Sequence, residues 1–100
     1  MTPQLPTEIY EKIVVLCKKY RVRELSLFGS RANGTFSADS DFDFLVDFFP
    51  DANIGLFDFS RIQIDLEEMI GKKVDLVPKK GLKSRIRERV LSEAEIIYAE

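Results

Sequence analysis

An alternating pattern between Asp41 and Phe49, with apolar residues at every second position and mostly aspartates between them, is the feature that most constrains the fold of this chain. Side chains two positions apart on a β-strand point to the same face, with Cα atoms about 6.6 Å apart. One face of the expected strand therefore turns toward a core, and the other begins with two carboxylates, a spacing that suits a divalent metal ion. The apolar row is Phe42, Phe44, Val46 and Phe48, and the opposite row is Asp41, Asp43, Leu45 and Asp47.

A second strand and a tight turn precede the paired acids. The segment from Arg23 to Phe28 has leucines at alternate positions and ends at Gly29 and Ser30, where the chain must turn. Backbone N–H groups and a hydroxyl at such a turn can bind phosphate oxygens, above all where a short helix begins. The sequence therefore predicts a phosphate-binding turn eleven residues before Asp41.

A third acid lies in a later expected strand, from Lys73 to Val77. Val74 and Leu76 would face the core there, and Asp75 would point outward. Neighbouring carboxylates repel one another unless a cation or partner compensates their charge. If this strand pairs beside the first two, three carboxylates come together at one site that would bind a cation: those of Asp41, Asp43 and Asp75.

Helical periodicity predicts the elements between and around these strands. A first helix is expected from Thr7 to Tyr20, and a middle helix from about Leu56 to Ile70 ends where Gly71 suits a left-handed cap. The middle helix is the crossover between the strands of Asp43 and Asp75. Its expected inward residues are Leu56, Phe59, Ile62, Leu66 and Met69.

The last part of the chain, from about Ser84 to Ala99, is expected to form a terminal helix that buries Ile86, Val90, Ala94 and Ile97. Strands connected through packed helices give an α/β (α+β) fold, with a mixed sheet of three or four strands covered by helices. A chain of 100 residues with 45% hydrophobic content supports one compact core, so residues 1–100 are expected to form a single domain.

Composition excludes several kinds of site. There is no histidine, and Cys17 is the one cysteine, on an apolar helical face, so zinc sites and Ser-His or Cys-His nucleophiles are ruled out and Cys17 is expected in the core. Oxygen ligands remain, and they suit magnesium. No secretory signal or membrane-spanning apolar run is present, which predicts a cytoplasmic protein.

A basic segment stands out against the chain's net charge of −2: Lys79, Lys80, Lys83, Arg85, Arg87 and Arg89 are offset only by Glu88. The segment is either a solvated helix face or a contact for nucleotide phosphates, RNA or an acidic partner. The acidic chain and the lack of aromatic residues among the basic ones disfavour a dedicated nucleic-acid binder.

The pattern of these motifs resembles the minimal nucleotidyltransferases of the DNA polymerase beta superfamily. That family has Gly-Ser, ten residues and Asp-x-Asp, and here Gly29-Ser30-Arg31-Ala32-Asn33-Gly34 is followed by Ser40-Asp41-Phe42-Asp43. The order of the expected elements along nearly the whole chain agrees with a polymerase beta-like nucleotidyltransferase fold. Asn33 departs from the basic residue that many relatives carry, so no role is assigned to it.

The resemblance implies a reaction and its residues. Asp41 and Asp43 would hold one or two Mg²⁺ ions, and Gly29 and Ser30 would bind the β- and γ-phosphates of ATP, with Arg31 either a phosphate contact or a structural arginine. Asp75 would complete the metal site or take the proton of an acceptor hydroxyl.

The resemblance also implies a partner. Minimal relatives of this size work as antitoxins beside HEPN-domain toxins, and some transfer AMP to a tyrosine of that toxin. Two alternatives stay open: a non-catalytic module that neutralises its partner by occlusion, with an apolar patch drawn from Phe48, Phe49, Phe57 and Phe59, or transfer to a small molecule or RNA whose acceptor site lies on a partner chain. Both homo- and hetero-oligomers are compatible with the sequence.

Overall fold

The computed structural model of the chain describes residues 5–29 and 41–100. Its elements are, in order, α1 (Thr7–Lys19), β1 (Val22–Phe28), β2 (Phe42–Phe48), α3 (Leu56–Ile70), β3 (Val74–Pro78), the 3₁₀ turn η1 (Lys79–Gly81), α4 (Ser84–Glu93) and β4 (Glu95–Ala99). The helices and strands expected before η1 are confirmed to within one residue at each end.

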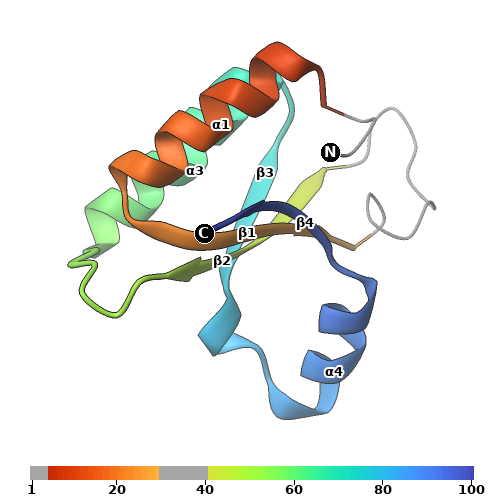
Figure 1. Cartoon of the computed structure of the whole chain (residues 1–100). Helices are drawn as coiled ribbons and strands as arrows, with labels where there is room; N and C mark the ends of the chain where they lie inside the picture. Colours follow the sequence, from red (N-terminus) through yellow and green to blue (C-terminus); the bar gives the residue numbers. More distant parts are fainter. Residues whose placement is uncertain (1–4, 30–40) are drawn as a thin grey trace.

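The described strands form one mixed sheet in the order β3-β2-β1-β4. β1 pairs antiparallel with β2 and β4, whereas β2 pairs parallel with β3. Figure 1 shows α1 and α3 side by side over one face of this sheet, with α4 beyond its other side. The parallel pair is joined through α3, as the sequence predicts, so the expected α/β fold with a mixed sheet is confirmed.

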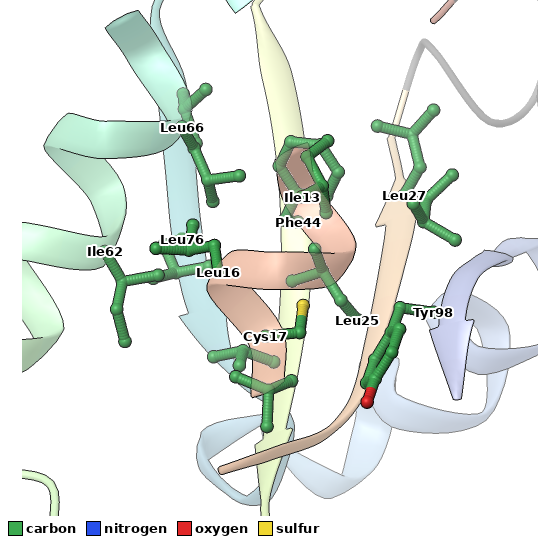
Figure 2. Close-up of a cluster of buried hydrophobic side chains, with 14 of the residues drawn as sticks. Ile13, Leu16, Cys17, Leu25, Leu27, Phe44, Ile62, Leu66, Leu76 and Tyr98 are labelled. Atoms are coloured by element: carbon green, nitrogen blue, oxygen red, sulfur yellow. The ribbon is translucent and has the colours of Figure 1, made fainter. Parts of the chain in front are cut away.

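The core lies between the two covering helices and the sheet. Figure 2 shows side chains of α1, α3 and all four described strands pointing toward one another there. Phe44 and Leu66 are fully buried, and Cys17 lies among them as expected. Gly71 ends α3 in the left-handed region at φ 76°, and its N–H donates to the carbonyl of Glu67, which confirms the expected cap.

The prediction of a terminal helix from Ser84 to Ala99 is wrong. The helix stops at Glu93, and residues Glu95–Ala99 form edge strand β4 beside β1. Consecutive Ile96, Ile97 and Tyr98 favour a strand, and pairing satisfies backbone groups of β1 that would otherwise lie open at a sheet edge. Ile97 is buried as a strand residue, whereas Ile86 on α4 is largely exposed.

The prediction that Leu56, in the middle helix, faces inward is also wrong. Leu56 is 79% exposed at the first residue of α3. Ile62 and Leu66, further along the same face, are buried as predicted.

We predict that Cys17 resists thiol reagents as long as the chain is folded. Burial raises the pKa of its thiol to about 12, from an ordinary value of 9.0, so the reactive thiolate is suppressed at pH 8. A colorimetric thiol assay should show labelling at the rate of unfolding and full labelling in denaturant; labelling at the free-thiol rate would contradict the buried position.

The raised pKa of Cys17 also makes the free energy of unfolding fall as the pH rises. The unfolded thiol ionises from about pH 9 while the folded thiol keeps its proton, so the thiol's contribution is complete below pH 9 and falls between pH 9 and 12. Cys17→Ala should remove this part of the alkaline loss in a comparison of unfolding free energies across that range.

Candidate active site

The acidic site is built by two neighbouring strands. In the parallel register of β2 and β3, Asp43 lies opposite Asp75, and adjacent strands are about 4.8 Å apart. Val74 and Leu76 are buried on the helix side, so Asp75 between them points to the other face, where it is exposed. Asp41, exposed, directly precedes β2. The structure thus sets Asp43 and Asp75 opposite each other, with Asp41 near enough for its charge to act on Asp43.

The charges of the three acids act on one another. Asp43 is half-buried, and burial raises the pKa of its carboxyl first, followed by the negative charges of Asp75 and Asp41. A carboxylate that is desolvated and faced by two others costs stability when ionised, and a cation relieves that cost. The arrangement is electrostatically suited to a positively charged ligand.

The start of this strand pair is held by backbone and side-chain hydrogen bonds. The N–H of Phe42 donates to the carbonyl of Lys73 at 3.0 Å, and the N–H of Val74 donates to Oε2 of Glu67 on α3 at 3.0 Å. Each acid is therefore one residue from a fixed backbone position. Such support limits the movement of Asp43 and Asp75 relative to each other.

Gly29 packs against Asp43 from the end of β1. It has φ 74°, in the left-handed region, and a Cβ added to it would lie 2.6 Å from Oδ2 of Asp43. Phe28, the preceding residue, is the register partner of Asp43. Only glycine therefore combines this backbone conformation with this approach to the carboxylate.

The donor set fits magnesium together with a phosphate ligand. Carboxylate oxygens are hard ligands, and Mg²⁺ is typically held by one or two carboxylates, with waters and substrate phosphates completing its shell. Within residues 5–29 and 41–100 no group of three acid or thiol side chains is arranged so that it could hold a metal ion by itself. Magnesium at Asp43 and Asp75 would therefore need further ligands, such as water or substrate phosphates.

Two of the expected phosphate-binding residues, Ser30 and Arg31, lie outside the described residues, so their roles stay predictions. Among the other acids of β2, Asp47 shares the face of Asp43 but takes no part in the site. It is buried, and Nε and Nη2 of Arg23 both donate to its Oδ2. Nothing in the alternation of the strand distinguishes this structural acid from the two at the strand's start.

The expected phenylalanine patch is only partly formed. Phe48 and Phe59 are half-buried with ring centroids 6.5 Å apart, and Phe49 lies under the guanidinium of Arg21, whereas Phe57 is 91% exposed. Leu56, which the sequence places inward, joins Phe57 on the surface. The residues near this patch enclose a hollow of about 570 Å³, which sequence reasoning missed because it depends on the packing of a loop.

The chain belongs to the family described as the nucleotidyltransferase domain, whose family model matches residues 9–97. The expected family is thereby confirmed. No helix in the described part of the chain has the length and hydropathy to cross a membrane.

Similar proteins agree with the family. The protein adenylyltransferase MntA of Thermococcus cleftensis is 42% identical over 83 residues, which cover 83% of this chain and 80% of MntA. A solved structure described as a candidate minimal nucleotidyltransferase has a TM-score of 0.72 at 39% identity and covers 85% of each chain.

A third similarity is to the structure of the tri-AMPylated Shewanella oneidensis HEPN toxin in complex with MNT antitoxin. Its TM-score is 0.66 at 17% identity, over 93% of this chain and 71% of that chain. At this identity the similarity shows the fold.

We predict that Asp43→Asn raises the melting temperature at pH 7 or leaves it unchanged. The raised pKa of Asp43 means that ionising it in the folded chain costs stability, and this cost grows as pH rises from the ordinary value of 3.8 through the folded value. The advantage of the variant should vanish below that ordinary value, as thermal unfolding at several pH values will show.

Asp47→Asn on the same strand is the matched control. It removes charge from a buried, hydrogen-bonded carboxylate and should lower stability by about 1–2 kcal/mol. A large loss of stability in Asp43→Asn would contradict the electrostatic account and make that acid structural.

We predict that Gly29→Ala abolishes ligand binding at the acidic site, whereas Gly71→Ala does not. Both glycines have nearly the same positive φ, so both variants should lose about 1–2 kcal/mol of stability. Only Gly29 has Asp43 within reach of a new Cβ; Gly71 has nothing within 4 Å. Titration with Mg²⁺-ATP measures the difference, and equal binding by the two variants would contradict the role of Gly29.

Proposed function

We propose that this chain transfers AMP from ATP to a hydroxyl group, a tyrosine of a HEPN-domain toxin, and thereby acts as an antitoxin. The observation that carries the proposal is the register that sets Asp43 beside Asp75, with Asp41 and Gly29 around them. Membership of the nucleotidyltransferase family, a relative named as a protein adenylyltransferase, and the fold of a complex that contains an AMPylated HEPN toxin support it.

Asp41 and Asp43 are the residues that would hold one or two Mg²⁺ ions, with Asp75 completing the site. Bound there, magnesium supplies positive charge that offsets the negative charge of the triphosphate. The chain's own part is to place these carboxylates on one rigid strand pair. Gly29, with Ser30 and Arg31, would receive the β- and γ-phosphates at the turn.

In this proposal Asp75 also takes the proton of the acceptor hydroxyl. It is exposed beside the half-buried Asp43, so a hydroxyl from another molecule can reach it. As the hydroxyl oxygen bonds to the α-phosphorus, its proton passes to Asp75, and the bond from the α-phosphorus to the pyrophosphate oxygen breaks. The products are the adenylylated acceptor and pyrophosphate.

Neutralisation by occlusion is the second candidate function. The exposure of Leu56 and Phe57 beside a hollow favours it, because adjacent exposed apolar side chains mark a contact surface. The two candidates differ in whether the acids are needed. Neutralisation that survives Asp41→Ala with Asp43→Ala would establish occlusion.

We predict that the chain, incubated with ATP, Mg²⁺ and a HEPN-domain protein of the same organism, adds adenylyl groups to a tyrosine of that protein. Asp75→Asn should slow transfer by about 10²-fold or more because the proton acceptor is lost. Intact mass and peptide mapping measure the product. Asp65→Asn, whose carboxylate pairs with Arg61 on α3, is the control and should transfer normally.

A HEPN protein that stays unmodified at saturating ATP would overturn the proposal. Titration of ATP, GTP, CTP and UTP with and without Mg²⁺ separates the donor question from the acceptor question, since metal-dependent binding of one nucleotide identifies the donor.

A further inference from the structure

The hollow near the phenylalanines lies at the far end of β2 from the acids. It is lined by the ends of β2 and β3, the loop that follows β2, the start of α3 and η1. Its volume is about 570 Å³. We call it the distal groove, lined by Val46, Asp47, Phe48, Phe49, Pro50, Ala52, Ile54, Gly55, Leu56, Phe59, Pro78 and Lys80.

The walls of the distal groove are held in place without a ligand. Nη2 of Arg21 donates to both carboxylate oxygens of Asp51 at 2.8 and 2.9 Å, and its guanidinium lies 4.7 Å from the ring centroid of Phe49. The carbonyl of Arg21 accepts the N–H of Phe49, and the N–H of Ala52 donates to the carbonyl of Phe49. Preformed walls reduce the entropy that binding costs.

The start of α3 fixes the apolar rim of the groove. The N–H of Gly55 donates to Oδ2 of Asp58, which caps the helix and sets the direction of its first residues. Leu56 then lines the groove at 79% exposure, and Phe57 follows at 91%. Two adjacent large apolar side chains held in water beside an apolar hollow are the features of a docking surface.

The charge of the groove selects its occupant. Asp47 and Lys80 are the charged lining residues, and Asp47 is already bound by Arg23. None of the ion pairs formed within residues 5–29 and 41–100 includes Lys80. Lys79 beside it is paired with Glu24 at 2.8 Å, and the basic residues of α4 are not among the lining residues, so among the residues that the structure describes Lys80 is the free cation of the groove lining. A complementary ligand therefore carries apolar side chains next to carboxylates.

We propose that the distal groove docks an acidic segment of the HEPN-domain protein, inserting an apolar side chain against Leu56 and placing a carboxylate on Lys80. The identity of the partner rests on the proposed function; the chemistry of the segment rests on the groove. Asp47 is four residues from Asp43 on β2, about 13 Å, so one partner can bind the groove and reach the acids without covering them.

Other occupants fit the groove less well. A single-stranded nucleic acid needs several cations along its phosphates, and the lining supplies Lys80 alone. A second copy of the chain, bound groove to groove in a two-fold contact, would bring Lys80 of both copies into one interface, where like charges repel.

The test is the affinity of the intact chain for the purified HEPN protein, by titration calorimetry. Leu56→Asp should raise Kd about tenfold or more, because it places a charge in the apolar rim. Lys80→Glu should raise Kd severalfold and weaken its salt dependence. Val15→Asp and Lys12→Glu, exposed positions on α1 outside the groove, are matched controls and should change Kd less than about twofold.

Several results would overturn the docking proposal. Unchanged Kd in Leu56→Asp, or no complex with the wild-type chain, overturns the docking proposal. The proposal is also overturned if the wild-type chain self-associates in sedimentation and Leu56→Asp abolishes that association. It is likewise overturned if Lys80→Glu removes binding of single-stranded RNA while the affinity for the HEPN protein stays the same. Mg²⁺-ATP binding should be unaffected in all four variants.

The two proposals fail differently. A complex that Leu56→Asp weakens, with no AMP on the HEPN protein, leaves the groove standing and overturns the adenylyl transfer. If AMP is transferred at the normal rate and neither Leu56→Asp nor Lys80→Glu changes Kd, the adenylyl transfer stands and the docking proposal is overturned.

Discussion

The parallel pairing of β2 with β3 is the constraint on which the site depends. Asp43 and Asp75 come from strands separated by a helix, and only this register sets them opposite each other. The register is held by the core, since Phe44, Val46 and Val74 are buried on the helix side. A slip of β3 by one residue would turn Val74 to the other face and carry Asp75 into the core, which the loss of burial and the desolvated charge disfavour.

The packing of the same core offsets the free energy that the acidic site costs on folding. A half-buried Asp43 facing two further acids opposes folding whenever it is ionised, and its raised pKa expresses that cost. The sheet holds these charges together because each is attached to a strand whose other face is well packed. A bound cation would offset the free-energy cost of ionising Asp43 in the folded chain. Cation binding and folding stability are therefore coupled through this one carboxylate.

The sequence predicts the acids well because they obey simple periodicity. Alternation in β2, a glycine with positive φ and an outward Asp75 between two buried residues each follow from local rules, and the structure agrees. The terminal helix fails because β4 forms through its partner β1, a long-range pairing that helical spacing cannot reveal. Leu56 also fails: its spacing fits the inward face, but it is the first residue of α3 and is exposed, and helical spacing does not show which turn of a helix is covered. Ser30 and Arg31 lie outside the described residues and rest on the motif alone.

A single strand links the two surfaces of the molecule. The residues at the start of β2 carry the acids, and those at its end line the distal groove, so chemistry and docking would share one rigid element. In the proposed reaction, the acceptor would therefore be held at the distal groove and not at the acids themselves. A partner anchored at one end of the strand would supply its hydroxyl at the other end at high effective concentration, and the rigidity of β2 would fix the distance that the partner must span.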